Sequence, residues 1–439
     1  MSTSGPPAAA HTRRRLAVVG GGWAGLAAAV EATKTGHRVS VFEMSRQWGG
    51  RARSSRETGL DNGQHILIGA CRETFALMRA VGADPERLLL RRPLALQWAD
   101  GRGLQLRPGP AAWTFAQAVL RSDAWPLTDG LRLLAACARW AAAGFRCDAT
   151  LTVDALCARL PASVRERLID PLCVAALNTP ATQASAAIFL RVLRDGLLGG
   201  RGASDLLIPR RPLHELLPEP ATRWLAARGA ELHPGRRVMA LATAADGAWT
   251  LDGQRFDGVV LACPANEAAR LVQALAPAWA QTAGALRYEP IVTVFARSEG
   301  LRLPLPMLAL REDAHSPAQF VFDHGQLGGL PGRFAFVASG AATWVERGLR
   351  ATSEAVLAQA ARELAPWGWR ADGVIVEATI AERRATFRST PGLLRPPTAI
   401  APRLVAAGDY VDGPYPATLE GAVRAGKAAA YVMEGFLTM

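Results

Sequence analysis

A run of glycines between two short apolar segments constrains this chain more than any other feature. Residues 16–19 are apolar and typical of a buried strand, and they lead directly into Gly20-Gly-Gly-Trp-Ala-Gly25. The apolar run over 26–35 predicts a helix, 39–42 predict the next strand, and Glu43 stands at its end. This order of strand, G-x-G-x-x-G, helix, strand and acid indicates a dinucleotide-binding unit.

Each position of this motif has a physical purpose. Gly20 permits a tight turn, Gly22 lets the backbone approach a pyrophosphate, and Gly25 lets the helix pack closely on the strand. Trp23 and Ala24 lie within the glycine motif just before that helix, whose free N–H groups and dipole favour phosphate. We therefore expect all five residues to take part in cofactor binding.

The residues after the motif decide between the two common dinucleotides. Glu43 comes 18 residues after Gly25 and can accept hydrogen bonds from both hydroxyls of an adenosine ribose. Soon after it, Gly50 and Arg51 close a Gly-Gly-Arg element that would bring more backbone and a cation to the pyrophosphate. NAD domains do not need this element, so it favours FAD. The alternative is a Gly-Gly turn with solvated arginines.

Two distant segments fit the same cofactor. A strand near 234–242 containing Val238, and an apolar strand over 256–262, suggest that the chain returns to the nucleotide-binding sheet. Near the end, a strand leads to Gly408 and Asp409, whose carboxylate can lie against a ribityl chain. A helix to about residue 437 begins near Thr418 and Leu419 and can aim its dipole at the flavin. The alternative for Asp409 is a simple helix cap.

Length and pattern together predict an α/β protein with two interleaved domains. A chain of 439 residues is too long for one compact core. We predict a Rossmann-like FAD-binding domain made of 13–90, 224–285 and 398–439. An α+β substrate-binding domain is predicted from 91–223 and 286–397.

Two stretches give the substrate-binding part its character. Residues 111–145 read as helices carrying three tryptophans among apolar residues and arginines. Such helices can cover a lipid tunnel or lie on a membrane, or simply pack on a core of their own. The apolar runs at 291–295 and 334–338 predict strands that floor an apolar pocket.

Charge and cysteine content exclude several function classes. The net charge is +12, but the basic residues are almost all arginines spread over the whole chain, which argues against a nucleic-acid interface. A membrane-facing basic surface is compatible with this charge. The 6 cysteines form no Cys-x-x-Cys pair, so we expect reduced thiols and no metal site.

The beginning of the chain resembles an export signal only in outline. Residues 1–12 are small and polar, and Arg13, Arg14 and Arg15 precede an apolar run. The glycine spacing explains that run better as a cofactor motif. No other segment is long and apolar enough to span a bilayer. We therefore expect a cytoplasmic protein with peripheral contact on the inner face of the cytoplasmic membrane.

These motifs together carry a family resemblance. The unit from Gly20 to Glu43, the element ending at Arg51 and the Gly408-Asp409 segment resemble the amine oxidase and phytoene desaturase superfamily of flavoproteins. Within it, the chain is similar to the hydroxysqualene dehydroxylase family, also called squalene-associated FAD-dependent desaturases. The resemblance covers about 15–437, and the narrower similarity rests on 61–67, 172–180 and 207–213.

The resemblance implies a reaction and its partners. The reaction is the reductive removal of hydroxyl from hydroxysqualene, an isoprenoid lipid, to give squalene for hopanoid synthesis. Reduced FAD would be the hydride source. No second G-x-G-x-x-G follows a strand, so electrons must reach the flavin from an external donor or from NAD(P)H that binds transiently.

The resemblance also places 61–65 beside the flavin ring. Gly63 would allow close backbone approach there, and Gln64 and His65 could reach the ring edge or the substrate. A hydroxyl leaves more easily when protonated, and histidine is the best nearby acid. We name His65 and Asp61 as catalytic candidates. The alternative is that Asp61 is buried and structural and that His65 is a satisfied core histidine.

Other function classes are compatible with the same sequence. The same cofactor-binding fold serves carotenoid desaturases and amine oxidases, because fold does not fix function. A non-catalytic membrane or scaffold protein could keep FAD for stability alone. A nucleic-acid binder would instead show salt-dependent retention on DNA.

Overall fold

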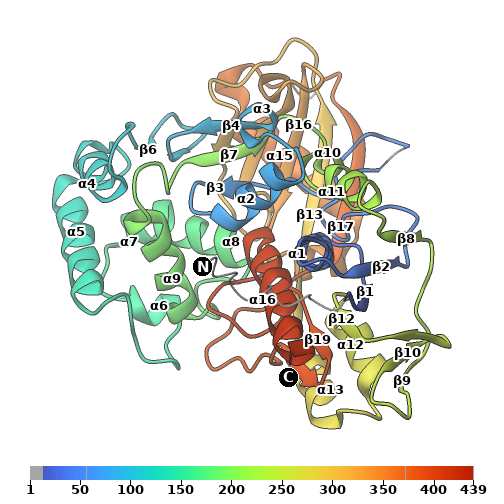
Figure 1. Ribbon diagram of the computed structural model, residues 1–439. Helices are drawn as coiled ribbons and strands as arrows, with labels where there is room; N and C mark the ends of the chain where they lie inside the picture. Colours follow the sequence, from blue (N-terminus) through green and yellow to red (C-terminus); the bar gives the residue numbers. More distant parts are fainter. Residues whose placement is uncertain (1–12, 56, 371, 439) are drawn as a thin grey trace, which may run out of the picture.

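A six-stranded sheet organises the computed structural model, which describes residues 13–55, 57–370 and 372–438 (Figure 1). Neighbouring strands pair in parallel except for the first two, which are antiparallel. The sheet therefore joins three segments that are far apart in the sequence. Its order is β18 (Ala399–Ala401), β19 (Leu404–Ala406), β12 (Gly258–Leu261), β1 (Arg15–Val19), β2 (Arg38–Glu43) and β8 (Glu231–Pro234).

Both faces of this sheet are covered, as a parallel sheet requires. Successive side chains of a strand point to opposite faces. Leu16 and Val18 of β1 pack with helices α1 (Trp23–Lys34) and α16 (Leu419–Thr438). Ala17 and Val19 join the opposite core, which is closed by a small sheet and two helices. These are β9 (Leu241–Thr243), β10 (Trp249–Leu251), β11 (Gln254–Phe256), α12 (Ala265–Val272) and α13 (Pro277–Gly284).

Helices α1 and α16 pack side by side although their sequences lie at opposite ends of the chain (Figure 1). Gly426 makes this possible, because a Cβ there would overlap the backbone of Ala24 and approach Ala27 Cβ to 2.9 Å. At the end of α1, His37 Nε2 lies 2.7 Å from Glu434 of α16. The last helix thus completes the core that the first helix begins.

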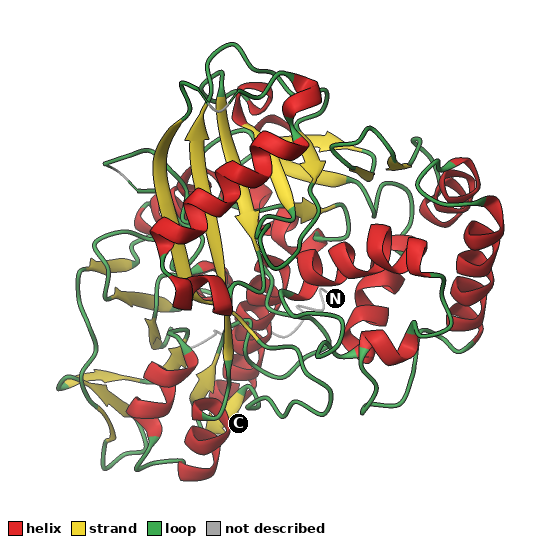
Figure 2. Cartoon of the chain, turned by 180° about the vertical axis from the view of Figure 1, so that it is seen from behind, coloured by secondary structure: helices red, strands yellow, loops and turns green. Residues whose placement is uncertain are grey.

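A five-stranded antiparallel sheet forms the second layer system. Alternation again divides its side chains, since Phe295 faces one core and Val294 faces the other. Figure 2 shows a long helix, α15 (Leu349–Glu363), across the outer face. The strand order is β14 (Met307–Ala309), β15 (Phe320–Asp323), β16 (Arg333–Ala338), β13 (Tyr288–Arg297) and β17 (Ile375–Phe387).

A helical block packs on the inner face of that sheet. Its main members bury Phe115, Trp125, Trp140 and Phe189 in a core shared with Phe295 of the sheet. The predicted helical region over 111–145 is confirmed as two helices, and only Trp113 of its three tryptophans lies at the surface. The block comprises α4 (Ala111–Arg121), α5 (Leu127–Ala142), α6 (Val153–Leu156), α7 (Ala162–Val164), α8 (Asp170–Leu177) and α9 (Ala186–Leu198).

Small elements connect these layers. A three-stranded sheet joins chain segments on both sides of the helical block, and α2 packs on α16. The remaining elements are β3 (Leu67–Ile68), α2 (Arg72–Ala80), α3 (Pro85–Leu88), β4 (Leu89–Arg92), β5 (Ala95–Gln97), β6 (Gly103–Gln105), the π-helix Arg165–Ile169, β7 (Leu206–Pro209), α10 (Leu213–Leu216), α11 (Pro218–Ala226), α14 (Ala342–Arg347), and the 3-10 turns His324–Leu327 and Ala365–Trp367.

The α/β class is confirmed, but two predicted strands are wrong in detail. The strand expected near 234–242 ends at Pro234, because Gly235 turns the chain with a φ of +76°. The segment expected as one strand over 256–262 is split at Asp257 between β11 and β12. The proposed domain boundary at 224 falls inside α11, whose Leu225 packs in the same core as Leu26.

The described residues can be searched for membrane-spanning helices, disulfide bonds and metal sites. No helix in 13–55, 57–370 or 372–438 is long and apolar enough to cross a membrane. All six cysteines are free, and burial raises the pKa of Cys263 to about 12. Within the same ranges, no group of three or more potential ligands could hold a metal ion. Residues 1–12 of the predicted leader-like segment lie outside the described residues.

Candidate active site

One cavity of about 520 Å³ lies where the six-stranded sheet, the five-stranded sheet and the helical block meet. It brings together residues from almost the whole length of the chain. Of the predicted site residues, all but Gly25 and Asp61 line it. They are Gly20, Gly22, Trp23, Ala24, Glu43, Gly50, Arg51, Gly63, Gln64, His65, Val238, Gly408, Asp409, Thr418 and Leu419.

Glycines form a backbone cradle along one side of this cavity. Gly22 bridges to Gly49 as two parallel strands would, and a Cβ at Gly50 would lie 3.2 Å from the Gly22 Cα. Gly20 has a φ of +116°, which favours glycine in its turn. A Cβ at Gly25 would overlap the Gly20 carbonyl. Gly25 therefore serves close packing, while Gly22 and Gly50 leave room beside the helix start.

Glu43 closes the far end of the cradle. Its Oε2 accepts a hydrogen bond of 2.6 Å from the Gly21 N–H, and its Oε1 accepts one of 2.7 Å from the Ser45 N–H. These bonds orient the carboxylate toward the cavity, which it lines. Each carboxylate oxygen can accept a further hydrogen bond, so ribose hydroxyls can still bind.

Arg51 crosses the cavity to the loop after β19. Its Nη2 donates to Asp409 Oδ1 at 2.6 Å, and its Nη1 donates to the Ala385 carbonyl at 2.8 Å. The predicted cation and the predicted ribityl-binding carboxylate are therefore ion-paired with each other. This pair ties the second glycine element to the end of the sheet.

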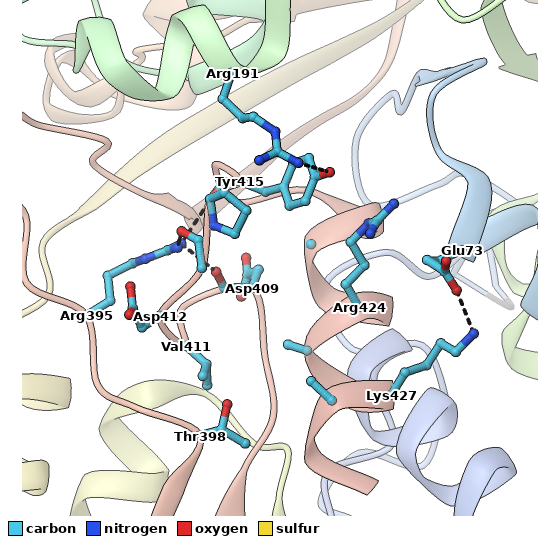
Figure 3. Close-up of a pocket in the computed structure, with 15 residues that line it drawn as sticks. Glu73, Arg191, Arg395, Thr398, Asp409, Val411, Asp412, Tyr415, Arg424 and Lys427 are labelled. Carbon is cyan, nitrogen blue, oxygen red and sulfur yellow. Dashed lines mark hydrogen bonds and ion pairs between the residues drawn. The ribbon is translucent and has the colours of Figure 1, made fainter. Parts of the chain in front are cut away.

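The loop that carries Asp409 is held from outside by a second polar cluster (Figure 3). Arg395 donates to the Tyr415 carbonyl at 2.9 Å and to the Asp409 carbonyl at 3.3 Å. The Tyr415 hydroxyl meets Arg191 at 2.9 Å and donates to Asp195 at 2.8 Å. These contacts line a separate cavity of about 390 Å³, and Asp409 lies between the two cavities. The cluster fixes the loop without reaching the main cavity.

Three further predicted binding positions line the cavity, one in a loop and two at the start of α16. Val238 lies in a loop rather than a strand, and Arg270 Nη2 donates to its carbonyl at 2.9 Å. Thr418 caps α16, since its hydroxyl accepts the Gly421 N–H at 3.0 Å. Leu419 begins that helix at the cavity wall. The N-terminus of α16 thus points at the cavity, as the sequence predicts.

Asp61 does not line the cavity, which favours the structural alternative. Its Oδ1 accepts hydrogen bonds from the Ser54 hydroxyl and, at 3.0 Å, from the Leu213 N–H. Burial raises the pKa of this carboxyl above its ordinary value. Asp61 therefore joins two loops, and it is distinct from the polar groups that reach the cavity.

His65 does line the cavity, but its environment disfavours a charged ring. Burial lowers the pKa of His65 below its ordinary value, and the Gly63 carbonyl lies 3.2 Å from Nδ1. The neutral ring donates from Nδ1 to this carbonyl, which leaves Nε2 free toward other partners. Gly63 itself has a φ of +93°, so the turn that presents His65 needs glycine.

Two side-chain pairs that involve the sequence neighbours of His65 were not predicted from the sequence. His324 Nε2 lies 3.0 Å from Gln64 Oε1, and Asn62 Nδ2 donates to Glu382 Oε2 at 2.9 Å. Burial lowers the pKa of His324 to about 4, so it is neutral and donates to Gln64. No signal in the sequence indicated Glu382, because β17 reads as a polar strand that also carries Glu377, Arg383 and Arg384.

Comparison with known proteins agrees with this geometry. The model of the flavin containing amine oxidoreductase family matches residues 23–433. Hydroxysqualene dehydroxylase of Rhodopseudomonas palustris is 31% identical over 94% of this chain and 96% of that protein. The enzyme of the same name from Sinorhizobium fredii is 28% identical over 95% of this chain and 97% of its own.

A solved structure shows the same fold at lower identity. An oxidoreductase from Methanosarcina mazei superposes with a TM-score of 0.73 at 15% identity, covering 96% of this chain and all of that one (100%). This chain belongs to the flavin containing amine oxidoreductase family. It is an FAD-dependent oxidoreductase, which confirms the predicted cofactor and enzyme class.

The residues present fit FAD. Within the described part of the chain no side chain caps the N-terminus of α1, so its first N–H groups can receive a pyrophosphate. Tyr410 lines the cavity, and its buried hydroxyl has no hydrogen-bond partner among the residues that the structure describes. A buried polar atom of this kind points to a missing partner. Burial also raises the pKa of Tyr410 well above its ordinary value, so it is a neutral donor.

Proposed function

We propose that this flavoprotein reductively removes the hydroxyl of hydroxysqualene to give squalene, in the pathway toward hopanoids. The observation that carries the proposal is the similarity to relatives named hydroxysqualene dehydroxylase over almost the full length of both chains. The similarity spans the chain segments that supply both walls of the cavity, and it is not limited to the cofactor motif.

The wall opposite the cradle suits an isoprenoid. Ile291 and Ile380 contribute from the five-stranded sheet, and Ala175 and Ala176 contribute from α8. These side chains offer apolar surface, and burying the substrate's hydrocarbon chain against it stabilises binding. His65 and Glu382 are among the polar residues that line the same cavity. A long hydrocarbon with one hydroxyl matches this combination of apolar and polar lining.

Bound FAD, once reduced, supplies the hydride that replaces the hydroxyl. The chain's own residues must then bind the lipid, help the hydroxyl to leave and exclude water. We propose that His65 gives a proton to the departing hydroxyl. Glu382, a carboxylate at the same wall, would stabilise positive charge that develops on the substrate. Because burial disfavours protonated His65, this step should speed up as pH falls.

The proposed partners follow from the substrate. An external electron donor reduces the FAD, and the protein makes peripheral contact with a membrane to reach its lipid. The roles of Gly22, Gly50, Glu43 and Asp409 at FAD remain proposals that rest on their place in the cavity. The runner-up function is that of another amine oxidase-superfamily enzyme, such as a carotenoid desaturase or an amine oxidase.

An anaerobic single-turnover experiment tests the proposal. Photoreduced holoprotein is mixed with hydroxysqualene, and flavin absorbance and squalene are followed together. We expect reoxidation of the flavin with one squalene formed per flavin. Holoprotein that stays reduced, or that is reoxidised without forming squalene, contradicts the proposal. Peroxide released from amines in air would identify an amine oxidase, and a lengthened polyene chromophore would identify a desaturase.

A further inference from the structure

The outer surface of the helical block is unusually apolar. Trp113 of α4 is 64% exposed, and Leu127 and Leu131 of α5 are 59% and 52% exposed. Leu120 of α4 and Leu198 of α9 are exposed as well. Single exposed leucines are normal on soluble proteins, but several on packed neighbouring helices indicate an interaction surface.

Helix α5 shows that this exposure is a pattern. Its inner side buries Gly130, Leu133 and Trp140 in the core shared with the five-stranded sheet. Its outer side repeats small and apolar residues at helical spacing, and these are exposed: Leu127, Leu131, Ala135, Ala138 and Ala142. A helix that is apolar on the side away from its own core needs another apolar partner.

The charges around this surface have one predominant sign. Between residues 107 and 147 the sequence has five arginines and two aspartates, a difference of +3. Asp129 is half-buried, accepts a hydrogen bond of 2.6 Å from Ser163 and lies 3.6 Å from the guanidinium of Arg132, which itself stays exposed. The arginines Arg121, Arg132, Arg139 and Arg146 are exposed. Such a surface complements an apolar layer edged by negative charge.

The position of the block gives this surface a use. Helices α4 and α5 form one end of the molecule, away from the six-stranded sheet, in both views (Figures 1 and 2). Behind them, α8 places Cys173 and Leu177 in the block's core and Ala175 on the cavity wall. The same block therefore lies between the exposed apolar surface and the cavity.

We propose that this face, made of Trp113, Leu120, Leu127, Leu131 and Leu198 with the surrounding arginines, docks on an anionic lipid bilayer. The apolar side chains enter the boundary between headgroups and acyl chains, and the arginines pair with lipid phosphates. This face would make the peripheral membrane contact that is part of the proposed function. It depends on that contact and not on the dehydroxylation reaction.

Sedimentation of the FAD-loaded full-length protein with vesicles tests the face. We expect more binding to vesicles of phosphatidylcholine with phosphatidylglycerol than to phosphatidylcholine alone, and less binding at high salt. The double variant Leu127→Ser/Leu131→Ser should lower the partition coefficient at least tenfold. Arg132→Glu/Arg139→Glu should lower it at least tenfold on anionic vesicles alone, because each surface arginine contributes about fivefold.

Matched variants elsewhere on the surface serve as controls. Leu394→Ser and Tyr431→Ser replace apolar residues that are even more exposed, and Arg350→Glu reverses an exposed arginine on α15. All three should bind vesicles like the wild type. If the α5 variants and the control variants bind vesicles equally well, the proposed docking face is wrong. Conversion of an oligomer to a monomer by the α5 variants, with vesicle binding unchanged, assigns the face to a second copy and also overturns it.

The outcomes separate this proposal from the proposed function. Wild-type protein that binds no anionic vesicles contradicts the face and the membrane contact together, whatever its activity. If the protein docks through α5 but never converts hydroxysqualene, the result supports the docking face and contradicts the proposed function. Retained FAD and an unchanged circular dichroism spectrum in each variant show that the fold is intact.

Discussion

The two walls of the cavity are built in different ways. The cofactor side is made by backbone: Gly22 and Gly50 approach each other closely, Gly20 lies against the backbone of Ala262, and the Glu43 carboxylate is fixed by neighbouring N–H groups. The opposite side is made by side chains that meet across long sequence separations. Gln64 pairs with His324, 260 residues away, and Asn62 pairs with Glu382, 320 residues away.

This difference indicates which wall of the cavity can change its substrate specificity. A backbone cradle tolerates few substitutions because glycine conformations and close approaches define it. A wall of side chains on a sheet and a helix can change its lining while the fold stays the same. We therefore expect changes on the first wall to affect FAD binding and folding, and changes on the second to affect turnover.

Gly22→Val should have the largest effect on FAD. A Cβ at Gly22 meets only the Gly50 Cα, at an ordinary 3.8 Å, so the fold accepts it. The larger side chain would then occupy the place of the pyrophosphate, and we expect FAD affinity to fall more than about 100-fold, beyond the loss of one charge-assisted hydrogen bond. The FAD content of purified protein and titration of deflavinated protein measure this.

Two glycine variants make the result interpretable. Gly25→Ala should destabilise the apoprotein by about 1–3 kcal/mol, because its Cβ overlaps the Gly20 carbonyl. Gly435→Ala, on α16 with open space around it, should leave FAD affinity unchanged and should raise the stability of the apoprotein by up to about 1 kcal/mol, because alanine favours a helix over glycine. A Gly22→Val protein with a full complement of FAD would show that the cofactor does not use this cradle.

His65→Ala tests the opposite wall. It should keep FAD but lower single-turnover reoxidation by hydroxysqualene about 100-fold or more, the usual contribution of a general acid. The wild-type rate should rise as pH falls through the lowered pKa of His65, because the protonated ring is the active form. This rise should disappear in His65→Ala, and His65→Gln should restore little, since an amide cannot give up a proton.

Reduction of the same variants by an artificial donor is the control, because that half-reaction needs no acid at the substrate. A reoxidation rate within a few-fold of wild type would return His65 to a structural role. Since Asp61 and Tyr415 lie outside the main cavity, Glu382 and Tyr410 would be the next acids to test.

The cofactor side could be predicted from sequence because its signals are local. The strand, glycine motif, helix and Glu43 lie within one stretch, and the structure places them together as expected. Asp409 and Thr418 could be predicted for the same reason, because Asp409 follows the end of a strand and Thr418 precedes the start of a helix. Val238 was placed in a strand, but Gly235 ends that strand and Arg270 holds the loop instead.

The opposite side could not be predicted, because residue type does not give side-chain direction. Asp61 lies beside Asn62 in sequence, yet Asp61 turns to Leu213 and Asn62 turns to Glu382. His324 follows a strand with no motif around it, so nothing local indicates its contact with Gln64. These pairs exist only because the five-stranded sheet packs against the first part of the chain.

Glu43→Gln should weaken FAD binding without unfolding the protein. Loss of the charge removes charge-assisted hydrogen bonds of about 1.5–3 kcal/mol, which corresponds to roughly 10- to 100-fold in affinity. Titration of deflavinated protein with FAD measures the change. Glu354→Gln, an exposed position on α15, is the matched control and should bind FAD like the wild type. Equal affinity of both variants would remove Glu43 from the ribose site.

The smallest expected effect concerns His324 and appears as a pH dependence. Burial lowers its folded pKa to about 4, while its unfolded value is about 6.5. The unfolded state therefore binds more protons between these values, so stability is present above about pH 6.5 and is lost as pH falls. Between about pH 7 and pH 5 the loss should be about 2 kcal/mol.

Comparison with a variant separates the contribution of His324 to stability from that of the many carboxylates that titrate in a similar pH range. His324→Gln can still donate to Gln64 but cannot titrate, so its free energy of unfolding should fall less between the same two pH values. Urea denaturation at constant excess FAD measures both proteins, because bound cofactor itself shifts the transition. Parallel pH curves for the two proteins would mean that His324 is open to solvent in the folded protein, and that its hydrogen bond to Gln64 holds no buried neutral ring.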